Sequence, residues 1–192
     1  MERGRATRQR LFDAAVALIG EVGWGGVTTR MVAERAGVAP GVVHYHFASV
    51  TDLLVEASTA FAGALFGEVA HRLAEQPDIE SGLDWLLGEL SGYTGTDPAS
   101  LLIVETHLAS GRLPELRARL RDMIDDFRAC VVSWLRARGH TGDAEAAAVL
   151  LAATLDGLVL HHSLDPAMDV AALAGPLRAM LRADGHAGSE GR

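Results

Sequence analysis

The sequence predicts an all-α protein with about nine helices, in which a three-helix N-terminal unit containing a helix-turn-helix precedes a helical bundle. Apolar residues recur at helical spacing along most of the chain, and no stretch shows the alternation that is typical of a strand. Between residues 28 and 54, helix-start and helix-stop signals follow one another closely. With 192 residues, the chain can bury a sizeable core in one large domain or two small ones.

The first predicted helix covers residues 6–22 and carries one continuous apolar stripe. The stripe consists of Leu11, Ala14, Ala15, Leu18, Ile19 and Val22. We expect the helix to end at Gly23, before the Gly25–Gly26 pair. Its start carries a basic arm of four arginines: Arg3, Arg5, Arg8 and Arg10. Two interpretations of this arm remain open, contact with DNA and a solvated, frayed terminus.

The segment from residue 28 to 54 predicts two short helices joined by a tight turn. Thr28 is a good N-cap, and Gly37 can adopt the left-handed conformation that ends a helix. Pro40 suits the first turn of the second helix. The small residue Ala33 is followed by Gly37 four residues later, and Val43 comes six residues after that. This spacing favours a helix-turn-helix, whose second helix lies in the DNA major groove; the alternative is an ordinary helical hairpin.

The remainder of the chain predicts six more helices and a polar end. The expected helices cover residues 51–74, 80–93, 99–109, 113–138, 143–164 and 168–182. Each is separated from the next by a Gly- or Pro-containing connection. Residues 184–192 are Gly-rich and polar, so we expect them to be a disordered tail.

The net charge of −8 is unevenly distributed along the chain. Residues 1–50 hold six arginines and four acidic residues, a balance of +2, whereas the remainder has a balance of −10. The positive balance is therefore confined to the end that carries the helix-turn-helix. The single cysteine, Cys130, cannot form an internal disulfide and is expected to be a core thiol. Neither a signal peptide nor a membrane span is apparent, so the sequence predicts a cytoplasmic protein.

Three stretches carry a resemblance to the TetR family of bacterial transcriptional regulators. TTRMVAERAGV resembles the second helix and turn of that family, PGVVHYHF its recognition helix, and FASVTDLL the entry into its fourth helix. The resemblance implies a DNA-binding domain over residues 1–50 and an effector-binding and dimerisation domain over residues 51–183. It also implies a repressor that binds a near-palindromic DNA operator as a homodimer and is released by a small-molecule effector.

The resemblance implies three groups of site residues. The DNA-binding group is Thr28, Thr29, Arg30, Pro40, Gly41, His44, Tyr45 and His46. The candidate effector-binding group is Trp85, Tyr93, Glu105, His107, Phe127, Trp134, Asp156 and His161, each of which could instead be a core or surface residue. The candidate dimer interface is Leu151, Leu155, Leu158, Val159, Leu173, Leu177 and Leu181, for which packing inside the monomer is the alternative. No cofactor is expected.

Two positions depart from the family's usual pattern. His44 stands where the family usually has tyrosine, and Val50 where it usually has a lysine that contacts a DNA phosphate. One backbone contact is therefore expected to be missing. His44 can still hydrogen-bond a base edge or a phosphate, with an affinity that depends on pH.

Two other function classes are alternatives to an effector-controlled regulator. The first is a DNA-binding regulator without a small ligand, which a protein partner would control. The second is a di-metal enzyme in a helical bundle, which requires two Glu-x-x-His motifs. The chain has one such motif, Glu68 to His71, and no second. The sequence therefore predicts neither an enzyme nor a metal site.

Overall fold

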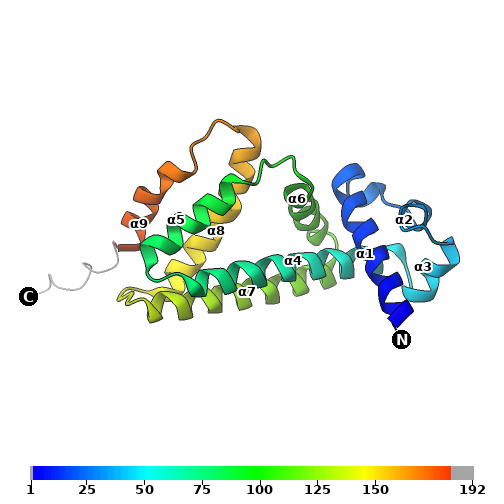
Figure 1. Ribbon diagram of the computed structural model, residues 1–192, viewed down its shortest axis with the longest axis horizontal. Helices are drawn as coiled ribbons and strands as arrows, with labels where there is room; N and C mark the ends of the chain where they lie inside the picture. The colour runs from blue at the N-terminus through cyan, green and yellow to red at the C-terminus, as the bar shows by residue number, and fades with distance from the viewer. Residues whose placement is uncertain (1, 183–192) are drawn as a thin grey trace, which may run out of the picture. The chain divides into compact units, whose positions relative to one another are not determined.

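A computed structural model describes residues 2–182 of the chain (Figure 1). Within that range it is all-α, as predicted, and no residue forms a strand. The α-helices are α1 (Glu2–Val22), α2 (Thr29–Arg35), α3 (Pro40–His46), α4 (Val50–Glu75), α5 (Ile79–Ser91), α6 (Pro98–Ser110), α7 (Pro114–Ala137), α8 (Ala144–Leu164) and α9 (Ala174–Arg182). Two single turns of 3₁₀ helix, η1 (Trp24–Gly26) and η2 (Ala171–Leu173), precede α2 and α9. The predicted tail, residues 184–192, lies outside the described residues.

The chain forms two compact units that are discontinuous in sequence. Unit 1 comprises the described residues of Met1–Leu65 together with Asp97–Asp122, and unit 2 comprises Phe66–Thr96 together with the described residues from Met123 onward. Helix α6 thus packs with the N-terminal helices, and α4 and α7 each contribute residues to both units. The expected division near residue 50 follows the linear sequence, whereas the packing units do not.

Unit 1 has a hydrophobic core to which α1, α2, α3, α4 and α6 all contribute. Leu11 and Ile19 of α1, Val32 of α2 and Leu53 of α4 have no exposed surface. Leu102 of α6, only 1% exposed, packs into the same cluster. The apolar stripe predicted on the first helix therefore does form the inner face of α1, except for Val22, which is 45% exposed.

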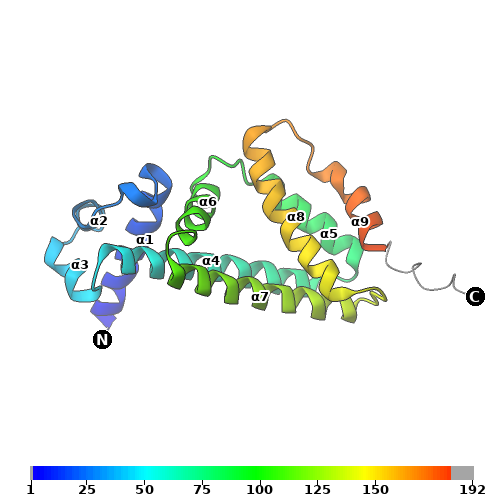
Figure 2. The ribbon, with the colours of Figure 1, turned by 180° about the vertical axis from the view of Figure 1, so that it is seen from behind.

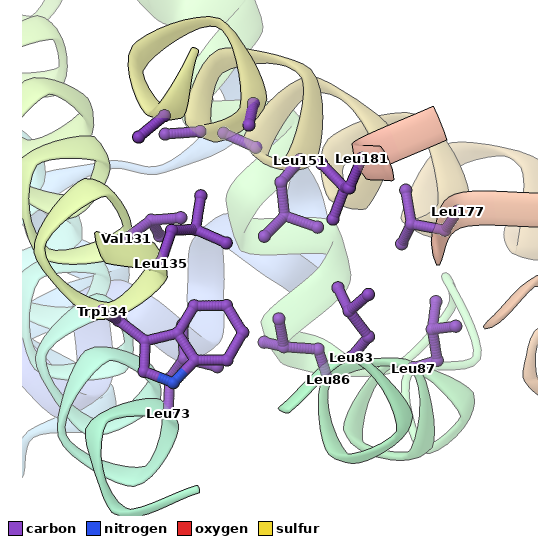
Figure 3. Packing of buried hydrophobic residues seen from close by; sticks show 14 of the residues in the cluster. Leu73, Leu83, Leu86, Leu87, Val131, Trp134, Leu135, Leu151, Leu177 and Leu181 are labelled. Atoms are coloured by element: carbon purple, nitrogen blue, oxygen red, sulfur yellow. The ribbon is translucent and has the colours of Figure 1, made fainter. Parts of the chain in front are cut away.

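Unit 2 buries leucines from α5, α8 and α9 against the C-terminal half of α7. Figure 3 shows Leu83 and Leu87 of α5 facing Leu151, Leu177 and Leu181 across a shared core. Figure 2 shows α8 crossing α5, and α9 also packs on α5. An ion pair between Arg178 of α9 and Glu80 of α5 adds to this packing.

Aspartates begin three of the later helices. The side chains of Asp78, Asp97 and Asp143 accept hydrogen bonds from backbone N–H groups in the first turns of α5, α6 and α8. The N–H of Ser81 donates to Asp78 over 2.7 Å, and this bond holds the pKa of Asp78 below its usual value. Each cap satisfies donors that a helix cannot satisfy internally.

The structure corrects three expectations about individual segments. Helix α1 begins at Glu2, four residues before the predicted start, so the arginines from Arg5 onward lie on a helix and not on a frayed arm. The last helix is shorter than predicted, because η2 replaces its first turns. Cys130 is exposed and is not a core thiol, because it lines an open groove and not the core.

By length and composition alone, two of the described helices, α4 and α8, are long and apolar enough to cross a membrane. The most apolar 18-residue window of each helix is 28% buried within the protein. Both helices contribute fully buried leucines to a core, Leu53 in α4 and Leu151 in α8. These two helices are therefore part of the hydrophobic cores of the two units.

Candidate nucleic-acid interface

Local hydrogen bonds build the helix-turn-helix as the sequence predicts. The Thr28 hydroxyl accepts a bond from the N–H of Met31 at the start of α2. The helix ends at Gly37, which has a φ of 65°, and the N–H of Val38 donates to the carbonyl of Ala33 over 2.9 Å. This pattern closes a helix with a left-handed residue, where a side chain would be strained. Pro40 then occupies the first turn of α3.

Burial of one face of α3 leaves the opposite face available to a partner. Val43 is 1% exposed and Phe47 is 4% exposed, so these residues anchor α3 in the core of unit 1. Four of the predicted DNA-binding residues, Pro40, Gly41, His44 and Tyr45, are exposed. Tyr45 is 85% exposed, which is unusual for a large aromatic side chain and marks it as a candidate contact residue.

The start of α2 places its predicted residues beside free backbone donors. Thr28 and Arg30 are exposed, and Thr29 is half-buried. The N-terminus of a helix attracts phosphates through its unpaired N–H groups and its dipole. Arg30 forms no hydrogen bond or ion pair with the part of the chain that the structure describes, so its guanidinium is available to DNA.

Other arginines near the N-terminus already have partners. Arg35 binds both carboxylate oxygens of Glu21, over 2.7 and 2.6 Å. These bonds hold the pKa of Glu21 below its usual value. Arg8 pairs with Glu56 and lies 5.1 Å from the ring centroid of Phe47. These two arginines therefore stabilise unit 1, unlike Arg30.

The half-buried His46 ends α3 beside other aromatic rings. Its ring lies edge-on to that of Tyr45, with centroids 5.1 Å apart, and 6.3 Å from that of Phe47. His46 therefore limits the orientations available to Tyr45. The expectation that both residues hold phosphates stays a prediction.

The candidate effector residues divide between the two units. Glu105 and His107 belong to unit 1. The carboxylate of Glu105 accepts a bond from the N–H of Trp24 over 2.8 Å, and His107 is exposed. Glu105 thus has a hydrogen-bond partner within unit 1. We had expected it to bind an effector.

In unit 2, only three of the candidate effector residues come together. Phe127 and Trp134 are buried in the core, and Trp85 packs against the same cluster. Tyr93 is half-buried, whereas Asp156 and His161 are exposed. These exposed side chains do not lie among the buried rings, so the predicted set does not form one site within unit 2.

His162 is a buried polar residue that the sequence analysis missed. It is 8% exposed, and its Nδ1 lies 2.9 Å from the backbone carbonyl of Tyr93, to which it donates as an N–H. The sequence did contain a signal for it. His162 follows Leu151, Leu155 and Leu158 at helical spacing, so it lies on the inner face of α8, whereas His161 points outward.

An open groove of about 560 Å³ lies between α4 and α7 in unit 2. It is lined mainly by small residues, among them Ala70, Ala74, Cys130 and Ser133. Of the candidate effector residues, only Trp134 lines it. The groove therefore does not unite the predicted effector residues.

The candidate dimer residues are mostly buried within a single protomer. Leu151, Leu177 and Leu181 are at most 5% exposed, because α5, α8 and α9 pack these leucines into the core of unit 2. Leu155, Leu158 and Leu173 are half-buried against that core, and Val159 is also half-buried. Leu151, Leu177 and Leu181 are therefore part of the core of the protomer, and their role in a dimer stays a prediction.

A different set of apolar residues faces outward on α8 and α9. Val149 is 46% exposed, Leu160 50% and Leu164 83% on α8, and Met180 is 50% exposed on α9. The three α8 residues recur at helical spacing and define one exposed apolar face, which we call the outer α8 face. Exposed apolar side chains on one side of a helix make it a candidate interaction surface, and Asp156, also exposed, lies on the same side.

Profiles of two protein domains match most of the chain. "Bacterial regulatory proteins, tetR family" matches residues 11–57, and "Tetracyclin repressor-like, C-terminal domain" matches residues 77–184. The HTH-type transcriptional regulator BetI of Rhizobium meliloti (strain 1021) is 30% identical over 186 residues, covering 93% of this chain and 91% of BetI. BetI of Proteus mirabilis (strain HI4320) is 32% identical over 162 residues, covering 82% and 80%.

Solved structures share the whole architecture. A transcriptional regulator from Streptomyces coelicolor A3(2) is 26% identical, with a TM-score of 0.75 over 93% of this chain and 98% of that one. A regulator from Saccharomonospora viridis, solved in complex with choline, is 22% identical, with a TM-score of 0.76 over 92% and 96%. At that identity, the second likeness concerns the fold alone.

Proposed function

This chain belongs to the TetR family of bacterial transcriptional regulators, and on that premise we propose that it is a repressor that binds a near-palindromic operator as a homodimer. A small-molecule effector releases it from DNA. Residues 1–50 are the DNA-binding domain, and residues 51–183 bind the effector and the second protomer. The protein acts in the cytoplasm, where its DNA target lies.

The exposed face of α3 is the observation that carries this proposal. Val43 and Phe47 fix the helix from inside, while Gly41, His44 and Tyr45 point away from the core. A helix anchored in this way can enter a major groove with its outer side chains against the base edges. Arg30, which has no partner in the part of the chain that the structure describes, can reach a guanine, whose two acceptors match its fork of donors.

The outer α8 face supports the homodimer. Leu160 and Leu164 would place apolar surface in water in a lone protomer, and a symmetric contact through α8 would cover the same residues on both copies. A two-fold axis would also set the spacing of the two reading helices on DNA.

We propose choline as the first effector to test. The Saccharomonospora viridis relative was solved in complex with choline, and aromatic ring faces attract quaternary ammonium groups. In unit 2 the guanidinium of Arg72 lies 5.5 Å from the ring centroid of Trp85, so a ring of this unit already binds a cation. The rings of Phe66 and Phe127 lie 5.4 Å apart in the same unit.

Selection of bound duplexes from a random DNA pool tests the DNA-binding part. We expect an enriched inverted repeat whose half-sites lie about one helical turn apart. A folded dimer that enriches no sequence would contradict the proposal, once any co-purified ligand has been removed by refolding.

Thermodynamic linkage between effector binding and operator binding tests the proposal that an effector releases the protein from DNA. If choline lowers operator affinity by some factor, the operator must lower choline affinity by the same factor, because both ligands act on one equilibrium. A thermal-shift screen with diverse metabolites extends the test beyond choline. A chain that no metabolite stabilises would favour the alternative regulator that a protein partner controls.

A further inference from the structure

Helix α6 is part of the packing that holds the reading helices. Leu102 of α6 is 1% exposed and lies in the same core cluster as Val32 and Val43 of the helix-turn-helix. Where α6 begins, a Cβ placed on Gly20 of α1 would lie 3.5 Å from the carbonyl oxygen of Pro98, so the two backbones approach closely. A shift of α6 would therefore disturb the core of unit 1.

One charged side chain of α6 reaches the connection between α1 and α2. Oε2 of Glu105 accepts a hydrogen bond from the backbone N–H of Trp24 over 2.8 Å. Trp24 begins η1, and the residue before it, Gly23, has no side chain to serve as the cap. Glu105 thus supplies from a distant helix the N-cap that η1 lacks locally.

The connection between α1 and α2 that Glu105 caps is rich in glycine. Gly23 has a φ of 74°, and Gly25 and Gly26 complete a flexible connection. Val27 follows, then Thr28, which caps α2. Local backbone bonds satisfy the N–H groups of Gly23 and Gly26, whereas the N–H of Trp24 is satisfied by Glu105 from outside the connection.

We infer that Glu105 is a positioning residue for operator binding: it ties η1 to α6 and so fixes where α2 begins. This inference rests on the proposed function, because it assigns to the tie a role in presenting α2 and α3 to DNA. A displacement of α6 would withdraw the carboxylate and release the connection.

Electrostatics and positioning predict opposite results for Glu105→Ala. Removing a negative charge from unit 1 should strengthen binding to the DNA polyanion if charge alone mattered. Loss of the tie should instead weaken operator binding, by about tenfold for a lost hydrogen bond to a charged group. Glu105→Gln removes the same charge but keeps an oxygen that can accept from Trp24, so it should restore most of the affinity.

The test compares three full-length variants: Glu105→Ala, Glu105→Gln and the control Glu115→Ala. Glu115 also lies in unit 1, but it is exposed and, among the described residues, pairs with Arg119 on its own helix. Amide hydrogen exchange by NMR reports directly on the hydrogen bond between Trp24 and Glu105. Titration with the operator selected by the wild-type protein measures how the loss of this bond changes operator affinity. We expect faster exchange at Trp24 and weaker binding only for Glu105→Ala.

The two readouts separate failure of this inference from failure of the proposed function. Unchanged exchange at Trp24 in Glu105→Ala would overturn the tie even if no operator had been found. Fast exchange with unchanged operator affinity would overturn the positioning role. If the wild-type protein selected no operator, the proposed function would fail, and altered amide shifts in α2 upon Glu105→Ala would still decide whether the tie positions that helix.

Discussion

The two units of the protein present opposite kinds of surface. In unit 1 the exposed side of α3 carries polar and aromatic groups such as His44 and Tyr45, with the free Arg30 nearby on α2. In unit 2 the outer α8 face carries Leu160 and Leu164. The first surface suits a hydrated polyanion, and the second suits another apolar protein surface. The side chains that each unit leaves exposed therefore indicate the class of partner that it binds.

The charge distribution leads to the same distinction. Unit 1 contains ten arginines and ten acidic residues, whereas unit 2 contains seven arginines and fifteen acidic residues. The whole net charge of −8 thus belongs to unit 2. Because several arginines of unit 1 are paired internally, the number of free arginines matters more for DNA binding than the net charge does.

The largest expected effect comes from Leu160→Arg, which places a charge on the outer α8 face. We expect the dimer dissociation constant to rise at least about 100-fold, because each protomer would bring an unpaired charge into a desolvated contact. Analytical ultracentrifugation measures this change. Leu108→Arg is the matched control: Leu108 is 60% exposed, but it lies on α6 in unit 1. If both variants dimerised as tightly as the wild-type protein, α8 would not form the dimer contact.

A second variant tests how tightly the core of unit 2 is packed. A Cβ at Gly82 would lie 2.8 Å from Cη2 of Trp134 and closer still to its Cζ2. Gly82→Ala should therefore lower the free energy of unfolding by about 1–3 kcal/mol through overpacking. Gly88→Ala in the same helix meets no atom within 4 Å and should be stabilising by about 0.5–1 kcal/mol. Denaturant titration of both variants measures the contrast; two stabilised variants would contradict it.

Local signals made the helix-turn-helix of unit 1 predictable from its sequence. Thr28, Gly37 and Pro40 act within a few residues of their own positions, as cap, helix stop and helix start. The spacing of Ala33 and Val43 then fixed which sides of α2 and α3 are buried. Because each of these effects is short-range, no knowledge of the rest of the fold was needed.

The candidate sites of unit 2 depended on contacts that sequence spacing does not specify. Leu151 of α8 and Leu177 of α9 lie on apolar helix faces, but a sequence cannot tell a protomer core from a dimer contact, since both require leucine. Glu105 was expected among the effector-binding residues, and the structure gives it a partner elsewhere. Its partner, Trp24, lies 81 residues away, and nothing in the intervening sequence indicates the pairing.

Two arginines on α2 allow a direct comparison of a free and a paired guanidinium. Arg30→Ala should weaken operator binding about tenfold, since its fork is available to a base edge or a phosphate. Arg35→Ala removes the same charge, but its partner is Glu21, so operator affinity should change much less. Titration of operator DNA by fluorescence anisotropy measures both. Equal losses would mean that charge alone, and not the availability of Arg30, governs binding.

Tyr45→Ala tests the exposed side of α3 in the same assay. The side chain contributes little to the core, because it is 85% exposed, so the variant should fold and dimerise normally. We expect a loss of operator affinity of about tenfold or less, from one missing contact in each protomer. Wild-type affinity in Tyr45→Ala would remove this residue from the proposed reading surface.

The smallest expected effect is a gain in operator affinity at low salt, from Val50→Lys at the start of α4. Val50 is half-buried against the core of unit 1, and Ser49 caps the helix through the N–H of Asp52. The long lysine stem can cover the same apolar surface while its ammonium reaches solvent. A positive charge near a helix N-terminus is mildly unfavourable, by about 0.3–1 kcal/mol, so the stability of the free protein should fall slightly.

On DNA, the new ammonium would meet a phosphate and release a counterion. A dimer would add two such contacts, so the plot of log affinity against log salt concentration should steepen by about two, with tighter binding at low salt. Val50→Met, which has a similar stem and no charge, controls for packing. An unchanged slope for Val50→Lys would place the start of α4 away from the phosphate backbone, and the surface of unit 1 that meets DNA would then be limited to α2 and α3.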